Sequence, residues 1–62
     1  MHANHLYNLM NQLVQEHKSL WRIKKEYMKE ATDEDEKKFW RKMEKDKEDH
    51  IKELTVIIKS KL

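Results

Sequence analysis

The chain contains neither glycine nor proline. These two residues supply most tight hairpin turns and strand breaks, so β-hairpins are poorly provided for. Charged residues make up 42% of the sequence, and most of them are Lys and Glu, which favour helices. Because there is no cysteine, neither a disulfide nor a thiolate metal site can hold the fold together. The composition therefore predicts an all-α protein whose buried surface comes from helix packing.

The first half of the chain carries the apolar pattern of a packed helix. Apolar residues recur every seven positions, with two more at the other heptad position that faces a partner helix. The first set is Leu6, Leu13, Leu20 and Tyr27, and the second is Leu9 and Ile23. This pattern predicts a helix over about residues 4–30.

A shift in the apolar pattern marks a break after that helix. The apolar residues return as Trp40, Met43, Leu54 and Ile57, one residue out of register with the first half. Between the two halves, Thr32 or Asp33 can cap a new helix. We expect a turn at about residues 31–33, a second helix at about 34–61, and one antiparallel helical hairpin over residues 1–62. A single unbroken helix of about 93 Å, at 1.5 Å per residue, remains the alternative.

Each predicted helix has more apolar surface than one neighbour can cover. Tyr7, Val14, Trp21 and Met28 form a second stripe on the first helix, displaced by about 100° from the first. We therefore expect the hairpins to associate as a four-helix bundle, in a homodimer or a higher oligomer. A helical partner protein would fit the same surface. The predicted oligomer interface consists of Leu6, Leu13, Trp21, Met28, Ile51 and Ile58.

A polar layer interrupts the expected core. A turn near residue 33 places Glu16 opposite His50, with Lys47 one turn away. A buried Glu–His pair, with Lys47 as a further counter-ion, would fix the register of the helices. Carboxylates and imidazoles inside a bundle are also ligands for iron or zinc. The metal interpretation names Glu16 and His50 as ligands, with additional candidates on adjoining faces, namely His17, Asp46 and Glu53.

Two short segments carry a resemblance to known metal proteins. The run LVQEHKSL at residues 13–20 and EDHIKEL at residues 48–54 resemble the helix pair of ferritin-like, rubrerythrin-like and hemerythrin-like proteins. The resemblance implies that Glu16 takes the place of the first-helix Glu and His50 that of the His in Glu-x-x-His. The sequence departs at Lys47, where that motif has Glu. The bridging carboxylate of a di-iron centre is missing, and a mononuclear Glu/His site is what the resemblance leaves.

Charge and hydropathy narrow the function classes. The net charge of +2 arises from 14 basic and 12 acidic residues, a balance that does not favour nucleic-acid binding. No apolar run approaches the roughly 20 residues of a membrane span, so we expect a soluble, cytoplasmic protein. We predict a self-associating interaction or scaffold module without catalytic activity; the alternative is a small metal-binding bundle. An enzyme is disfavoured because Ser19 and Ser60 lie outside the polar layer.

Overall fold

All of the regular structure described is helical. The computed structural model describes the backbone of residues 2–62 and the side chains of residues 4–62. Its elements are α1 (His2–Arg22), the π-helical segment η1 (Ile23–Tyr27), α2 (Met28–Glu30) and α3 (Glu34–Lys61). The predicted all-α class is confirmed. Residue 1, where the predicted domain begins, lies outside the described residues.

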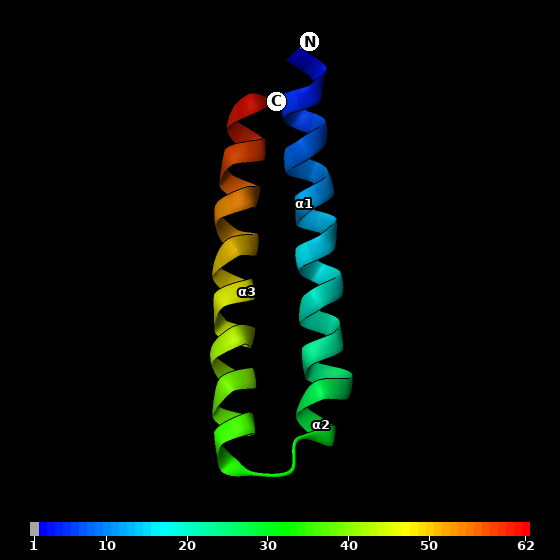
Figure 1. Ribbon diagram of the computed structural model, residues 1–62. Helices are drawn as coiled ribbons and strands as arrows, with labels where there is room; N and C mark the ends of the chain where they lie inside the picture. Colours follow the sequence, from blue (N-terminus) through cyan, green and yellow to red (C-terminus); the bar gives the residue numbers. More distant parts are fainter. Residues whose placement is uncertain (1) are drawn as a thin grey trace.

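The chain folds back on itself at residues 31–33. Figure 1 shows α1 and α3 side by side and antiparallel, with both ends of the chain at the same end of the molecule. The whole measures 46 × 15 × 14 Å, half the length of the unbroken helix that the sequence left open. Among residues 2–62, no helix combines the length and the apolar character that crossing a membrane requires.

Side-chain caps build the turn in the absence of glycine. Asp33 Oδ1 accepts a hydrogen bond from the Glu36 amide at 2.8 Å, as an N-cap does. The Glu36 carboxylate accepts in return from the Thr32 amide and hydroxyl, each at 3.1 Å. This is a capping box in which the Glu36 carboxylate bonds to Thr32, the residue before the N-cap, instead of to the N-cap itself. No described residue has a positive φ, so the turn needs no left-handed residue.

The first helical stretch is not one uniform α-helix, although its apolar periodicity alone predicts one. Within η1 the Met28 amide bonds to the Ile23 carbonyl, five residues back, which defines a π-helical turn. Ile23 is only 1% exposed, and the Tyr27 ring packs on Trp40 of α3 with ring centroids 4.8 Å apart. The wide turn thus lies where two side chains of the first stretch pack against α3.

The core within one chain is small. Among residues 4–62, the buried hydrophobic side chains are Ile23 and Ile58, at 1% and 7% exposure. Large hydrophobic side chains remain exposed on both long helices and at the residue that follows α3; they are Tyr7, Met10, Val14, Trp21, Phe39, Val56, Ile57 and Leu62. A single hairpin therefore leaves much of its apolar surface in water.

Candidate functional site

A buried carboxylate lies midway along the hairpin. Glu16 of α1 is 5% exposed and is the buried polar residue of the described side chains. Lys47 and His50 are three residues apart on α3, so they share a helix face and both reach Glu16. Together with Gln12, one turn before Glu16, these residues form what we call the Glu16 cluster.

Both oxygens of the buried carboxylate have partners. Glu16 Oε2 accepts from Lys47 Nζ at 3.1 Å and from Gln12 Nε2 at 3.0 Å. Glu16 Oε1 lies 2.6 Å from His50 Nδ1. In residues 4–62 no buried side-chain nitrogen or oxygen lacks a hydrogen-bond partner. The cluster thus meets the requirement that a buried charge be both paired and hydrogen-bonded.

The surroundings of Glu16 favour its ionised form. Burial by itself raises the pKa of the Glu16 carboxyl, but the hydrogen bonds from His50, Lys47 and Gln12 and the charge of Lys47 outweigh burial. The net effect is a pKa below the ordinary value for glutamate. Glu16 is therefore a carboxylate at neutral pH, and it joins the two helices as an anion.

The hydrogen bond to Glu16 also sets the tautomer of His50. A carboxylate only accepts hydrogen bonds, so His50 Nδ1 must carry the proton in this contact. In the neutral imidazole the lone pair then lies on Nε2. The His50 side chain is 52% exposed, so the ring is held on one side and open to solvent on the other.

An open hollow of about 290 Å³ adjoins the Glu16 cluster, and some of the predicted metal ligands line it. Glu53 lines it together with Glu16 and His50. His17 instead lines a different hollow, beside Lys45 and Asp49. Asp46 is half-buried on α3 and is not among the described side chains that line either hollow.

Within one chain, the two main predicted ligands bind each other. The Glu16–His50 hydrogen bond occupies one carboxylate oxygen, and the Lys47 ammonium lies on the other. Across the described side chains, no group of three or more His, Asp or Glu residues is placed to hold a metal ion. The local geometry is that of a hydrogen-bonded charge cluster between two helices, and a metal centre would need further ligands from a second chain.

The residues of the predicted interface differ widely in exposure. Trp21 is 56% exposed, whereas Ile58 is buried within the chain. The other four are half-buried, namely Leu6, Leu13, Met28 and Ile51. The π-helical turn separates Trp21 from Met28, which accounts for their different exposure despite the seven-residue spacing.

Two features escaped the interpretation of the sequence. Gln12 joins the cluster, and its position four residues before Glu16 is the signal that could have identified it. Met10 is 46% exposed beside Tyr7 and Val14, and its spacing of three residues from Tyr7 places it on the same helix face. Both signals are local, and both are common on helices.

Comparison with known proteins adds no family to this geometry. No protein-family model matches the chain, and no curated protein or solved structure is significantly similar to it. The resemblance to ferritin-like and hemerythrin-like helix pairs therefore stays a prediction from two short motifs.

Proposed function

We propose that the protein is a self-associating helical-hairpin module that acts in interaction or scaffolding and has no catalytic activity of its own. The observation that carries this proposal is the imbalance between a small core and a large exposed apolar surface. Ile23 and Ile58 are buried, while four large side chains of α1 are each about half exposed or more. A helix of a partner protein can occupy the same kind of surface.

The energetics of small domains support association. Ordering the backbone costs about 1–2 kcal/mol per residue, and a chain of this length buries too little surface alone to offset that cost with a wide margin. Small helical domains commonly gain the missing burial by oligomerisation. A second copy is the partner that is present wherever the protein is present.

The Glu16 cluster supports this role by fixing one alignment of α1 on α3. Sliding one helix by a turn, about 5.4 Å, would separate Glu16 from Lys47 and His50 and leave a buried charge unpaired. Polar residues inside helix seams are known to select one register in this way. A hairpin with a single register presents one defined surface to its partner.

Sedimentation equilibrium over a wide range of protein concentration tests the proposal. We expect a mass at least twice that of the chain at high concentration and a melting temperature that rises with concentration, because association stabilises the folded state by mass action. A monomeric mass and a constant melting temperature across the range would refute self-association.

A second candidate function is metal binding at the Glu16 cluster. Glu16 would act as the carboxylate that orients His50, so that Nε2 of His50 and the Glu53 carboxylate, which line one hollow, would be the ligands. Two copies that met at this hollow would supply four ligands of the kinds that Zn²⁺ or Fe²⁺ accepts, with one ion per two chains.

Thermal shift with added Zn²⁺ or Fe²⁺ and elemental analysis test this candidate. We expect a raised melting temperature that is lost in His50→Ala and retained in the matched control His17→Ala, because His17 lies away from the hollow. Absence of bound metal together with no shift in the wild-type protein would eliminate the metal site.

A further inference from the structure

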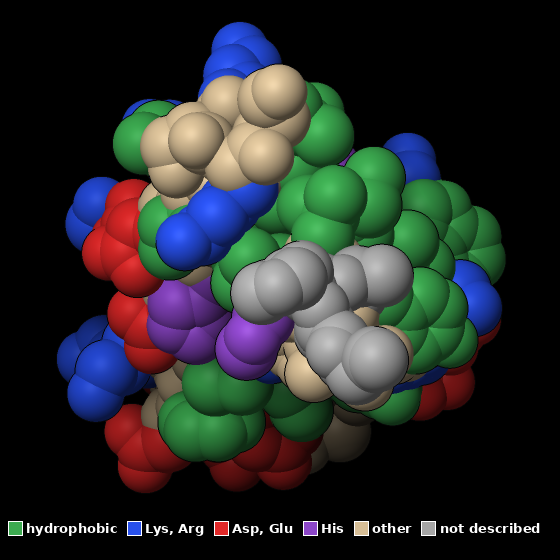
Figure 2. All heavy atoms as spheres, turned by 90° about the horizontal axis from the view of Figure 1, so that it is seen from above, with side chains coloured by type: hydrophobic (Ala, Val, Ile, Leu, Met, Phe, Trp, Pro, Cys, Tyr) green, Lys and Arg blue, Asp and Glu red, His purple; other side chains and the backbone are tan. Residues whose placement is uncertain are grey.

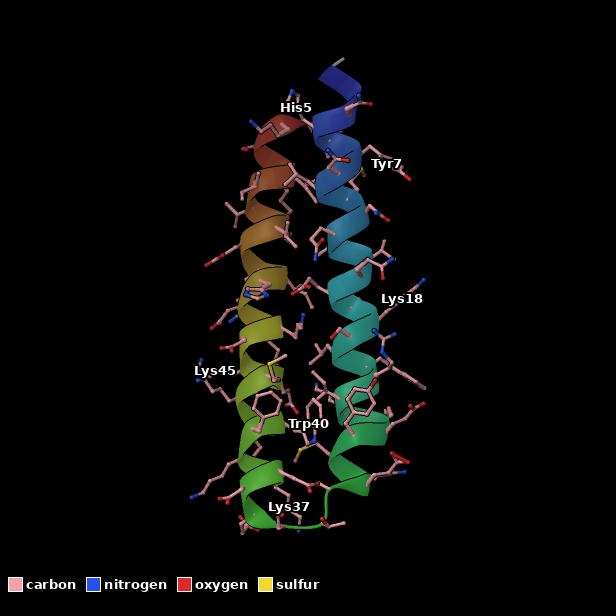
Figure 3. All side chains as sticks on the ribbon, in the orientation of Figure 1. His5, Tyr7, Lys18, Lys37, Trp40 and Lys45 are labelled. Atoms are coloured by element: carbon pink, nitrogen blue, oxygen red, sulfur yellow. The ribbon has the colours of Figure 1, made fainter. Side chains whose placement is uncertain are left out.

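The outer face of α1 carries a row of exposed apolar side chains. Tyr7, Met10, Val14 and Trp21 are 67%, 46%, 48% and 56% exposed, and their spacing places them on one side of the helix. We call these four residues the outer stripe. Figure 3 shows Tyr7 projecting from α1 away from α3, whereas Trp40 lies between the helices. In the view along the axis, hydrophobic side chains gather over the α1 side of the molecule (Figure 2).

Charge is distributed unevenly beside the outer stripe. The first fifteen residues of the sequence contain no Lys, Arg, Asp or Glu. The positions four residues after Tyr7 and Val14 both lie along one flank of the stripe. They are occupied by Asn11 and Lys18, so this flank is neutral in the N-terminal half of α1 and basic in the C-terminal half.

We propose that α1 packs antiparallel against α1 of a second copy, with the two-fold axis at Val14. This inference rests on the proposed self-association and names its surface and its orientation. Tyr7 and Trp21 each lie seven residues, about 10.5 Å, from Val14 along the helix. Tyr7 and Trp21 are thus symmetric about Val14, and each Tyr7 meets the partner's Trp21.

The uneven charge selects the antiparallel orientation. Residues whose numbers sum to about 28 lie side by side in this arrangement, since the helix rises evenly on both sides of Val14. Lys18 then lies beside the partner's Asn11. A parallel pair would instead place Lys18 next to the partner's Lys18, and like charges held together are unfavourable.

The outer face of α3 is a poorer surface for a second copy. Figure 2 shows Lys, Arg, Asp and Glu side chains gathered on the α3 side of the molecule. Val56 is the most exposed apolar residue in the interior of α3, at 68%, and it shares its shallow hollow with Lys52 and Glu53. An apolar partner face would have to strip water from those charges, whereas the outer stripe has neutral neighbours over half its length.

The size of the outer stripe fits a reversible contact. With roughly 150–250 Å² for a whole aromatic side chain, the four partly exposed residues offer on the order of 400 Å² per copy. A standard interface buries about 800 Å² per partner, so the stripe supplies about half and its polar flanks the remainder. We therefore expect a dimer that dissociates on dilution.

A pair of matched substitutions tests the surface. Val14→Asp places two carboxylates at the proposed two-fold axis, and Val56→Asp makes the same change at a site that is also exposed, on α3. We expect at least a tenfold weaker dimer for Val14→Asp by sedimentation equilibrium and an unchanged dimer for Val56→Asp. Circular dichroism shows whether each variant is folded, and if Val14→Asp loses helix, the crosslinking described next decides whether the interface lies at Val14.

Cysteine crosslinking tests the orientation without altering the stripe. The chain has no cysteine, so Asn11→Cys and Lys18→Cys each introduce a single thiol at the flank. After mixing the two variants and adding a short bis-maleimide, we expect the mixed dimer to exceed either homodimer several-fold. An excess of the two homodimers would overturn the antiparallel arrangement in favour of a parallel one.

The outcomes separate this inference from the proposal on which it rests. A monomeric wild-type protein at every concentration would refute self-association and the outer-stripe interface together. A wild-type dimer that persists in Val14→Asp, or that Val56→Asp abolishes, would refute the interface alone and leave self-association standing.

Discussion

Removing the ammonium group of Lys47 should destabilise the hairpin far more than removing any exposed lysine charge. Lys47 Nζ lies 3.1 Å from Glu16 Oε2, and the Lys47 side chain is only 18% exposed. Lys47→Met keeps a long apolar side chain, so packing changes little and the loss is chiefly that of the ion pair. Glu16 would remain buried with His50 and Gln12 as its only described partners.

The magnitude follows from the burial of the pair. A hydrogen bond to a charged group contributes about 1.5–3 kcal/mol, and the low exposure of both side chains limits screening by solvent. We expect Lys47→Met to lower the free energy of unfolding by about 2 kcal/mol at pH 7. In a domain of this size each kcal/mol shifts the melting temperature by roughly 4–8 °C, which gives a fall of roughly 8–16 °C.

The effect should depend on pH with a definite sign. The pKa of Glu16 is lower in the folded protein than in the unfolded chain, where it is about 4.3. The stability contributed by this carboxylate is therefore complete above about pH 4.3 and is lost as the pH falls through the lower folded pKa. Once Glu16 is protonated, Lys47 no longer has a charged partner, so the difference between variant and wild type should narrow as the pH is lowered from 7 to 3.

Urea denaturation at fixed protein concentration measures these differences. Lys45→Met is the matched control, because Lys45 lies on the same helix, 3.9 Å from Asp49, with a side chain 77% exposed. Its effect should stay within about 0.5 kcal/mol of zero. Equal losses for the two variants at pH 7, or a loss for Lys47→Met that is the same at pH 3 as at pH 7, would refute the reasoning.

Three further predictions concern the turn, the core and the polar layer. Asp33→Ala removes the N-cap of α3 and should cost about 1 kcal/mol in thermal denaturation; no loss would show that the cap is dispensable. Ile23→Ala should cost about 2–5 kcal/mol, and Ile57→Ala, at a 41% exposed site, much less, so equal losses would contradict the assigned core. Replacing both Glu16 and Lys47 by Leu should leave urea stability equal or higher, because packed apolar residues avoid the desolvation of a buried ion pair; a loss above 2 kcal/mol would contradict this.

The break between the two helical stretches was accessible from the sequence because its causes are local. Asp33 and Glu36 are three residues apart, the spacing at which a cap and its reciprocal partner bond, and the predicted break at residues 31–33 lies where α2 ends and α3 begins. The short turn then sets the alignment of the two helices by simple counting. That counting brings Tyr27 to Trp40 and Glu16 to His50, and both contacts are present.

The π-helical turn was not accessible in this way. No glycine or proline marks residues 23–27, and each of them is compatible with an ordinary α-helix. The turn lies where Ile23 is buried and Tyr27 packs on Trp40, so packing against α3 selects it. As a consequence, the apolar stripe with seven-residue spacing runs from Tyr7 through Val14 to Trp21 and does not extend to Met28.

Residue order alone thus determines that two helical stretches form with a break at residues 31–33 and that a polar layer crosses the seam, because periodicity and capping involve only near neighbours in the chain. Only the packing of the hairpin decides which polar groups of this layer bond to each other. Lys47 and His50 converge on the two oxygens of Glu16 because α3 lies within hydrogen-bonding reach of α1, a distance that no spacing in the sequence specifies. The same packing buries Ile58 and leaves Trp21 exposed, and it thereby sets which apolar residues face inward and which remain on the surface.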